Sequence, residues 1–158
     1  MQRYGSTRLT QDIDLAVAAV PQGVVGTALT FGGVTRPLPR CGIGCDYIVR
    51  ADDYASLYEE ALGAGISDAR LPRGIRLTRR EHLAAMKMAA GRDKDGWDLA
   101  WLILDGGLDL KMTAAVIRRH LGPYAVDAFR SDVEMARLER KLGRRGRGGV
   151  GGKRRRRG

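Results

Sequence analysis

Two aspartates one residue apart, Asp12 and Asp14, are the first side chains of this sequence whose types and spacing suggest chemistry. They lie in the apolar run DIDLAV, which predicts a short buried strand over about residues 11–18. Alternate side chains on a strand share a face, so the two carboxylates would stand roughly 6–7 Å apart along the chain. Such a pair suits Mg²⁺, and in two-metal sites the ions hold the attacking and leaving oxygens of a phosphoryl or nucleotidyl transfer. The alternative is that both acids face water on a half-exposed strand.

A third carboxylate, Asp46, lies in a second apolar run that predicts a strand over residues 44–50. Burying a carboxylate is costly unless the group is paired or binds a cation. Asp46 is therefore a candidate third ligand beside the first two acids. The alternative is that Asp46 lies at the edge of the strand, in solvent.

Charged residues also gather around a helical segment later in the chain. Lys87, Asp95 and Asp98 are eight and three residues apart, so they share a face if the helix is nearly continuous. Arg92 and Lys94 lie at a break marked by a glycine. One interpretation is a solvated helix face held by ion pairs, and the other is a cationic wall that faces a triphosphate.

The elements that must position these residues are predicted from hydrophobic period and turn residues. Besides the two strands, the pattern predicts a short helix over 24–33, a loop over 34–42 and a hairpin or edge strand over 66–77. Helices are predicted over 52–63, 78–90, 93–104, 109–122 and 123–142, and Thr78 to Glu81 has the spacing of a capping box. The result is an α/β (α+β) fold, with a small mixed sheet in residues 1–77 and a helical region, 78–143, packed on it in the same domain.

Composition and charge limit the class of protein. A chain of 158 residues that is 44% hydrophobic has room for one domain with a core. It contains no apolar run of membrane-spanning length and begins without the apolar centre of a secretory signal, so we expect a soluble, cytoplasmic protein with no membrane partner. Two cysteines, Cys41 and Cys45, and two distant histidines, His82 and His120, do not have the paired spacing of a zinc site.

The net charge of +10 comes mostly from the C-terminus. Residues 144–158 contain eight Lys or Arg and no acid, which leaves residues 1–143 with 20 basic and 18 acidic residues. This glycine- and arginine-rich segment cannot bury a core and is predicted to be disordered. It would contact RNA through charge, in a salt-dependent way, or remain a solvated extension without a ligand.

Two motifs together resemble a known family. Gly5, Arg8 and Thr10, followed by Asp12-Ile13-Asp14-Leu15, resemble the G-x-x-R-x-T-x-D-I-D-L signature of the minimal nucleotidyltransferases of the DNA polymerase beta superfamily. The run from Glu81 to Leu99 is similar to the helical segment L-x-A-x-K-x-x-A-x-R-x-K-D-x-x-D of the same group. The group includes the nucleotidyltransferase toxins of abortive-infection toxin–antitoxin systems, and the resemblance covers roughly residues 5–122.

The resemblance implies a reaction and a role for each matched residue. An acceptor hydroxyl would attack the α-phosphate of a nucleoside triphosphate and release pyrophosphate. Asp12, Asp14 and Asp46 would bind two Mg²⁺ ions, and Asp46 would also help to deprotonate the hydroxyl. The remaining matched residues are those expected near the nucleotide, Gly5, Arg8, Thr10, Lys87 and Arg92, and the supporting acids Asp95 and Asp98, which would orient the lysine.

The resemblance also implies partners, and it departs from the family at one point. The acceptor would be RNA, a protein or a small molecule, and a toxin-like role would add an antitoxin protein as a partner. The family places a Gly-Gly or Gly-Ser loop about a dozen residues before the first metal-binding aspartate, whereas Gly5-Ser6 lies much closer to Asp12. We therefore also consider an N-terminally truncated, inactive protein of the same fold that only binds its ligand.

Overall fold

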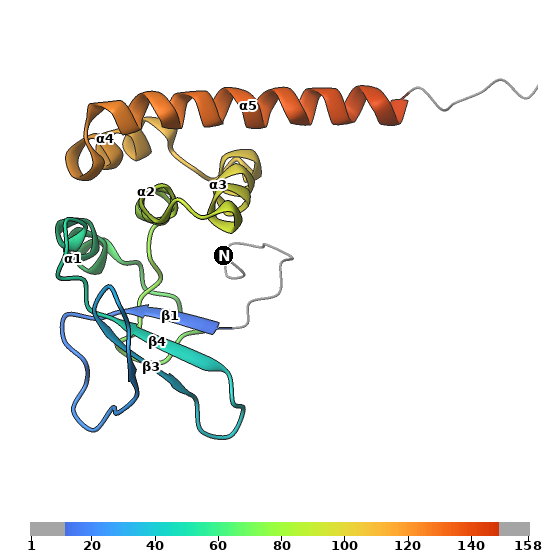
Figure 1. Ribbon diagram of the computed structural model, residues 1–158. Coiled ribbons are helices and arrows are strands. Elements are labelled where there is room, and N and C mark those ends of the chain that lie inside the picture. The colour runs from blue at the N-terminus through green and yellow to red at the C-terminus, as the bar shows by residue number, and fades with distance from the viewer. Residues whose placement is uncertain (1–11, 149–158) are drawn as a thin grey trace, which may run out of the picture.

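The computed structural model describes residues 12–148, which form a mixed four-stranded sheet and five helices. The strands are β1 (Asp12–Ala16), β2 (Thr27–Ala28), β3 (Gly33–Pro37) and β4 (Gly44–Ile48). The helices are α1 (Ala55–Ala64), α2 (Arg80–Ala90), α3 (Asp93–Asp105), α4 (Leu110–Leu121) and α5 (Pro123–Gly148). Figure 1 shows the sheet at one end of the molecule, the helices stacked over it, and α5 farthest from the sheet. The predicted α/β class and mixed sheet are confirmed.

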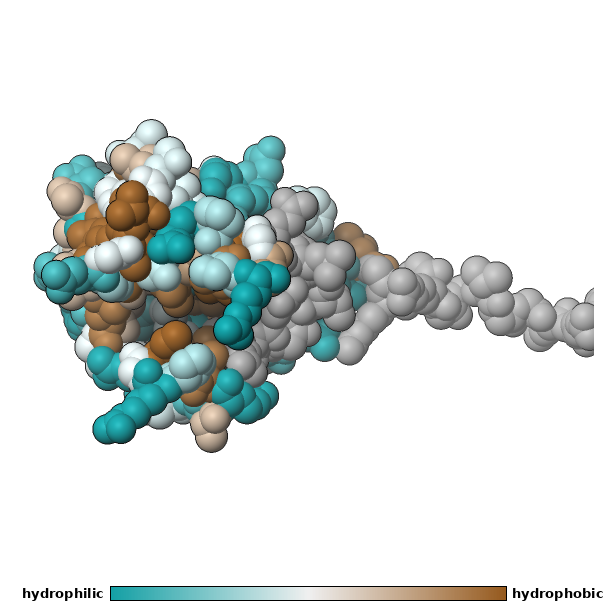
Figure 2. All heavy atoms as spheres, turned by 90° about the horizontal axis from the view of Figure 1, so that it is seen from below, coloured by the Kyte–Doolittle hydropathy of each residue, from teal (hydrophilic) through white to brown (hydrophobic). Residues whose placement is uncertain are grey.

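The sheet has the strand order β1-β4-β3-β2. β1 pairs with β4 in parallel, whereas β4 with β3 and β3 with β2 are antiparallel pairs. The predicted buried strand over residues 11–18 is thus only partly right, because within residues 12–148 β1 pairs on one side only and its first three residues are exposed. Ile13 is 41% exposed. Figure 2, seen from the sheet side, shows hydrophobic side chains dispersed among hydrophilic ones on that face.

The helix predicted over 24–33 is wrong, and the loop predicted over 34–42 is right only for residues 38–42. Thr27 pairs with Thr35 in the β2–β3 hairpin, and β3 occupies the first part of the supposed loop. The glycine pair Gly32-Gly33, which suggested the end of a helix, instead turns the chain into β3 with φ angles of 104° and 97°. A β-carbon on Gly33 would collide with the carbonyl oxygen of Tyr47, so this position requires glycine for its φ and for the close approach of β4.

The helices after residue 50 match the predicted pattern more closely. Ile66 and Leu77 form an isolated antiparallel bridge, in agreement with the predicted hairpin. Helix α2 begins at Arg80 with Arg79 as its N-cap, one residue later than the capping box that starts at Thr78 predicts. The Arg79 side chain instead donates to the carbonyl of Ala64 at 2.9 Å and ties the start of α2 to the end of α1.

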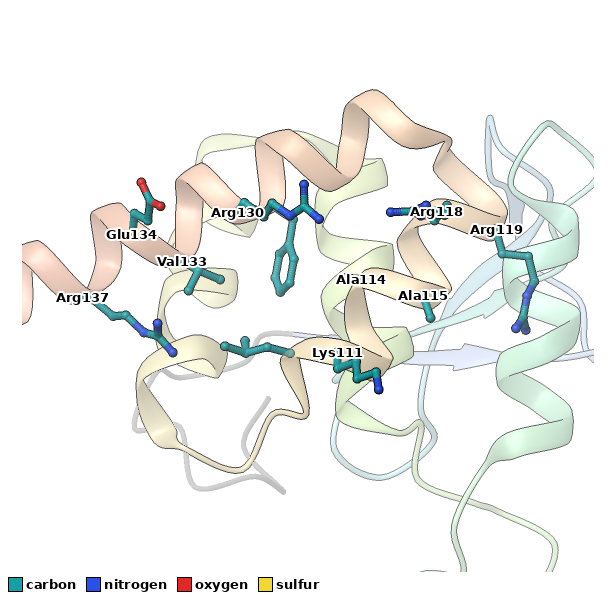
Figure 3. A pocket seen from close by; sticks show the side chains of 11 residues that line it. Lys111, Ala114, Ala115, Arg118, Arg119, Arg130, Val133, Glu134 and Arg137 are labelled. Atoms are coloured by element: carbon teal, nitrogen blue, oxygen red, sulfur yellow. The ribbon is translucent and has the colours of Figure 1, made fainter.

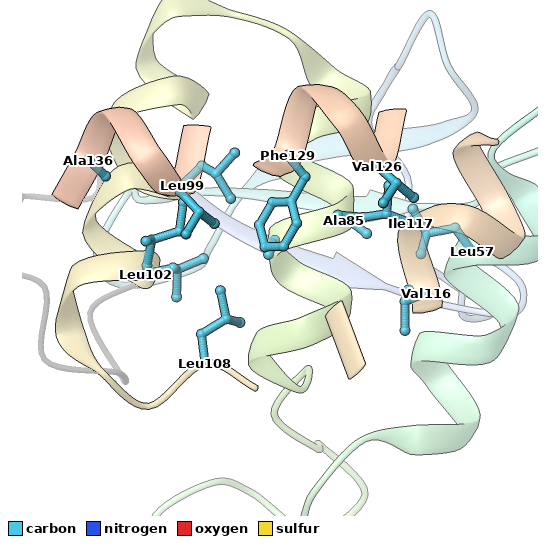
Figure 4. Close-up of a cluster of buried hydrophobic side chains, with 13 residues drawn as sticks. Leu57, Ala85, Leu99, Leu102, Leu108, Val116, Ile117, Val126, Phe129 and Ala136 are labelled. Carbon is cyan, nitrogen blue, oxygen red and sulfur yellow. The ribbon is translucent and has the colours of Figure 1, made fainter. Parts of the chain in front are cut away.

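The main core lies among the helices rather than under the sheet. Figure 4 shows Leu57 of α1, Leu102 of α3, Ile117 of α4 and Phe129 of α5 pointing into one cluster. Each of these four side chains is 2% exposed or less. The sheet contributes few buried side chains, chiefly Cys45 and Ile48 of the central strand β4. The buried hydrophobic cluster of the helical layer therefore contains no residue of the described sheet.

The C-terminal helix is longer than predicted. α5 was expected to end at residue 142, with disorder from Arg144 onward, but the helix continues through Gly148. Arginine has a high helix propensity, and extending an existing helix costs far less than starting one. The remaining tail residues, 149–158, lie outside the described part of the chain. Within residues 12–148, no helix is both long and apolar enough to cross a membrane.

Candidate metal and nucleotide site

The parallel pairing of β1 with β4 brings three aspartates together. The strand register places Asp14 opposite Asp46, and the two-residue period puts Asp12 on the same face. One carboxylate oxygen from each residue lies within 4.8 Å of the other two. Asp46 is on the central strand and half-buried, so the alternative of a solvent-exposed strand edge is wrong for this residue. The first two aspartates are exposed, as on the open edge of a site.

The electrostatics of this acidic cluster favour a bound cation. Although the Asp14 side chain is exposed, the protein atoms around its carboxyl group partly desolvate it and, followed by the negative charges of Asp12 and Asp46, raise its pKa above the ordinary value, while Lys87 and Lys94 oppose the shift. Within the described residues, none of the three aspartates forms an ion pair with a lysine or arginine. Three oxygen ligands that converge without a protein cation between them fit a hard divalent ion. The donor set is therefore suitable for Mg²⁺.

The cationic side of the site is built by the junction between α2 and α3. Gly91 ends α2 in a left-handed conformation, with a φ of 60°, and lets α3 begin two residues later. This turn places Lys87 and Lys94 close enough to Asp14 for their charges to lower its pKa. Arg92, at the same turn, interacts electrostatically with Asp14 as well. Figure 1 shows this junction above the end of the sheet that carries β1.

Lys87 is held by two buried carboxylates. Its Nζ lies 2.8 Å from Asp95 Oδ1 and 2.8 Å from Asp98 Oδ2, and these acids are 0% and 3% exposed. Burial alone would lower the pKa of Lys87, but the hydrogen bonds to both acids outweigh burial and raise it. The ion pairs expected from the spacing are thus present, but they are buried rather than solvated. Lys87 is the centre of a buried ion-pair network.

Arg92 completes this network and reaches solvent. Its Nε donates to Asp95 Oδ2 at 2.5 Å, while 59% of its side chain remains exposed. Burial would raise the pKa of Asp95, but Arg92 and Lys87 together lower it. A cavity of about 630 Å³ is bordered by Lys87 and Arg92 and extends to Trp97, which is 76% exposed. Lys87 and Arg92 therefore border this cavity, whereas Lys94 and the three clustered aspartates are not among its lining residues.

One cluster near the site was not found by the sequence analysis. The guanidinium of Arg50 lies 5.1–5.3 Å from the ring centres of Phe31, Tyr54 and Tyr58, and it also donates two hydrogen bonds to Asp52. Burial raises the pKa of Tyr58, and the negative charge of Asp14 adds to this shift while the positive charge of Arg50 opposes it. The only sequence pattern that pointed to this cluster was the i, i+4 spacing of Tyr54 and Tyr58. That spacing did not predict that the Arg50 guanidinium would lie against the rings.

Other residues considered in the sequence lie elsewhere or outside the described chain. Gly5, Arg8 and Thr10 precede residue 12, so the structure does not place them. Cys41 is exposed and Cys45 is buried, and both are free thiols. His82 and His120 both hydrogen-bond to Glu60, with distances of 3.2 and 2.7 Å from the ring nitrogens to the carboxylate.

Comparisons with known proteins place no constraint on this site, because no family model, curated protein or solved structure matches the chain.

Proposed function

We propose that this protein is a Mg²⁺-dependent nucleotidyltransferase that transfers a nucleoside monophosphate from a nucleoside triphosphate to an acceptor hydroxyl. The observation that carries the proposal is the convergence of Asp12, Asp14 and Asp46 within 4.8 Å. The cationic α2–α3 junction beside these acids supports it, as do the two sequence motifs. Mg²⁺, when bound there, would bind the triphosphate oxygens and offset their charge.

Each residue near the acids has a proposed task. Arg92 and Lys94 would bind triphosphate oxygens, since both lie near Asp14 and neither is buried. Lys87 would act mainly as a positioning residue, because its ammonium group is already held by two buried aspartates. Asp46 would accept the proton of the acceptor hydroxyl as its oxygen bonds to the α-phosphorus. The bond from that phosphorus to the bridging oxygen then breaks, and pyrophosphate leaves.

Calorimetric titration of the protein with each of the four nucleoside triphosphates tests the site. We expect binding of at least one of them in Mg²⁺, and at least a tenfold loss of affinity in EDTA or in the double variant Asp12→Asn/Asp14→Asn. The matched control is Asp53→Asn/Glu59→Gln, which removes two exposed acids outside the cluster and should bind like the parent. If no nucleotide binds the parent protein, or if binding ignores both Mg²⁺ and the two acids, the proposal is wrong.

Transfer itself requires a second assay. The protein is incubated with α-³²P-labelled nucleoside triphosphates and Mg²⁺, and label is followed in bulk RNA, in the protein and in small molecules. Pyrophosphate release together with label in one of these fractions would support the enzyme and identify the class of acceptor. Mg²⁺-dependent binding without pyrophosphate release would favour the alternative of a non-catalytic protein with the same fold.

A further inference from the structure

A groove between α4 and α5 forms a second surface, separate from the acidic cluster. Its volume is about 800 Å³, and none of its lining residues belongs to the acidic cluster or to the ion-pair network around Lys87. The floor is apolar and consists of Leu110 and Ala114 from α4 and Phe129 and Val133 from α5. Phe129 and Val133 are 2% and 7% exposed, so the floor continues into the core of the helical layer.

The rim of the groove is strongly cationic. Lys111, Arg118 and Arg119 line it from α4, and Arg130 and Arg137 line it from α5, as Figure 3 shows. Glu134 is the only acid among the lining residues.

Some of these cations are already balanced within the protein. Arg119 pairs with Glu60 at 2.6 Å, and Arg130 pairs with Asp127 at 3.0 Å. Within the described residues, Lys111, Arg118 and Arg137 form no ion pair. The groove thus keeps an excess of uncompensated positive charge around an apolar floor.

We propose that this groove binds an acidic amphipathic α-helix of a partner protein. Lys111 and Arg118 are seven residues apart on α4, and Arg130 and Arg137 are seven apart on α5, so each rim presents charges about 10.5 Å apart. A helix laid in the groove can place carboxylates against the cations of both rims while its apolar stripe faces the floor. Recognition of an amphipathic helix by an apolar groove uses this pattern of i, i+3, i+4 and i+7 anchors.

The floor favours a protein segment over a nucleic acid. A cationic rim alone would also attract RNA, but sequence-independent binding of single strands relies on exposed aromatic faces on which bases stack. Phe129 is the only aromatic residue among those that line the groove, and its ring is buried in the core. The exposed part of the apolar floor, which comes from the half-buried Leu110 and Ala114 because Phe129 and Val133 are already buried, instead gains free energy when aliphatic side chains cover it. Charge and apolar surface together therefore fit an acidic amphipathic helix.

The test measures binding of a designed probe to the full-length protein by fluorescence anisotropy. The probe is a fluorescein-labelled 18-residue peptide with leucines on one helical face and glutamates on both flanks. We expect the parent protein to bind it at least tenfold more tightly than a scrambled peptide of the same composition. Arg118→Glu/Arg137→Glu should weaken binding at least tenfold, and Glu134→Lys should strengthen it severalfold.

The matched control separates groove charge from net charge. Arg73→Glu/Lys141→Glu changes the net charge equally but alters exposed residues outside the groove, and it should stay within twofold of the parent. Equal binding of the scrambled peptide, equal weakening by the control, or no binding by the parent would overturn the proposal. Tighter binding of an 18-nucleotide single-stranded RNA, lost in the groove variant, would assign the groove to nucleic acid and would also overturn it.

Discussion

Replacement of Lys87 by methionine should destabilise the protein strongly, because it removes the cation between two buried carboxylates. Methionine keeps much of the length and apolar character of the lysine side chain but removes its charge. Asp95 and Asp98, which are 0% and 3% exposed, would each lose a partner at 2.8 Å. The α2–α3 junction would then contain buried negative charge without its central counter-ion.

The expected magnitude follows from burial. Removal of one partner of a buried ion pair costs about 3–5 kcal/mol, because the remaining charge is left uncompensated. Arg92 still pairs with Asp95, but its side chain is 59% exposed and solvent screens the contact. We therefore expect Lys87→Met to lower the free energy of unfolding by about 2–4 kcal/mol. For a chain of this size the loss corresponds to a decrease in Tm of about 4–16 °C.

Urea unfolding followed by far-ultraviolet circular dichroism measures this loss. Lys94→Met is the matched control, since Lys94 is exposed and has no ion pair within the described residues, and it should change the free energy of unfolding by less than about 0.5 kcal/mol. A double-mutant cycle of Lys87→Met with Asp98→Asn should give a coupling energy of at least about 1 kcal/mol. If Lys87→Met is as stable as the parent, the buried network does not use this charge, and Lys87 would be available to bind phosphate.

Two further predictions concern stability elsewhere in the fold. Burial disfavours the charged form of Glu60, but hydrogen bonds from Arg119, His120 and His82 outweigh it and lower its pKa to about 2. As the pH falls from 4.5 towards 2, the free energy of unfolding of the parent should therefore decrease by about 1–2 kcal/mol more than that of Glu60→Gln. Urea unfolding at each pH measures both values, and an equal pH dependence of the two proteins would contradict this assignment. Gly33→Ala should lower the free energy of unfolding by at least about 2 kcal/mol, because the residue has a φ of 97°. Gly96 lies in α3 with open space around it, so Gly96→Ala should raise the free energy of unfolding by about 0.5–1 kcal/mol. Equal effects of the two alanines, by thermal unfolding, would refute the role given to Gly33.

The acidic cluster shows which features of the site the local sequence pattern can predict. The two-residue period of a strand was enough to place Asp12 and Asp14 on one face, and an isolated acid in the next recognised apolar run indicated Asp46. The register that sets Asp14 beside Asp46 depends on the parallel pairing of β1 with β4, which no local signal specifies. The three aspartates were therefore predictable from the sequence, but the short distance between Asp46 and the other two was not.

The β2–β3 hairpin shows why the first part of the sheet was predicted wrongly. A glycine pair after a mixed apolar run is compatible with the end of a helix and equally with a tight turn between strands. The chain forms a turn at Gly32-Gly33 because the backbone of β4 and of the residues after it lies too close for a side chain at either position. The sequence analysis did not predict the α4–α5 groove for a related reason. The cations and small apolar residues of α4 and α5 form a groove only because the two helices pack against each other, and no local pattern shows that packing.

The buried network also bears on the charge balance at the proposed metal site. Lys87 and Arg92 are matched by the two carboxylates of Asp95 and Asp98, so this network adds little net charge to its surroundings. Among residues 12–148, Lys94 is then the cation outside this ion-pair network whose charge, together with that of Lys87, acts on Asp14 opposite three clustered carboxylates. The excess of negative charge corresponds to one divalent ion. A second Mg²⁺, as the family resemblance implies, would need the negative charge of a bound triphosphate, so metal binding without nucleotide should approach one ion per chain.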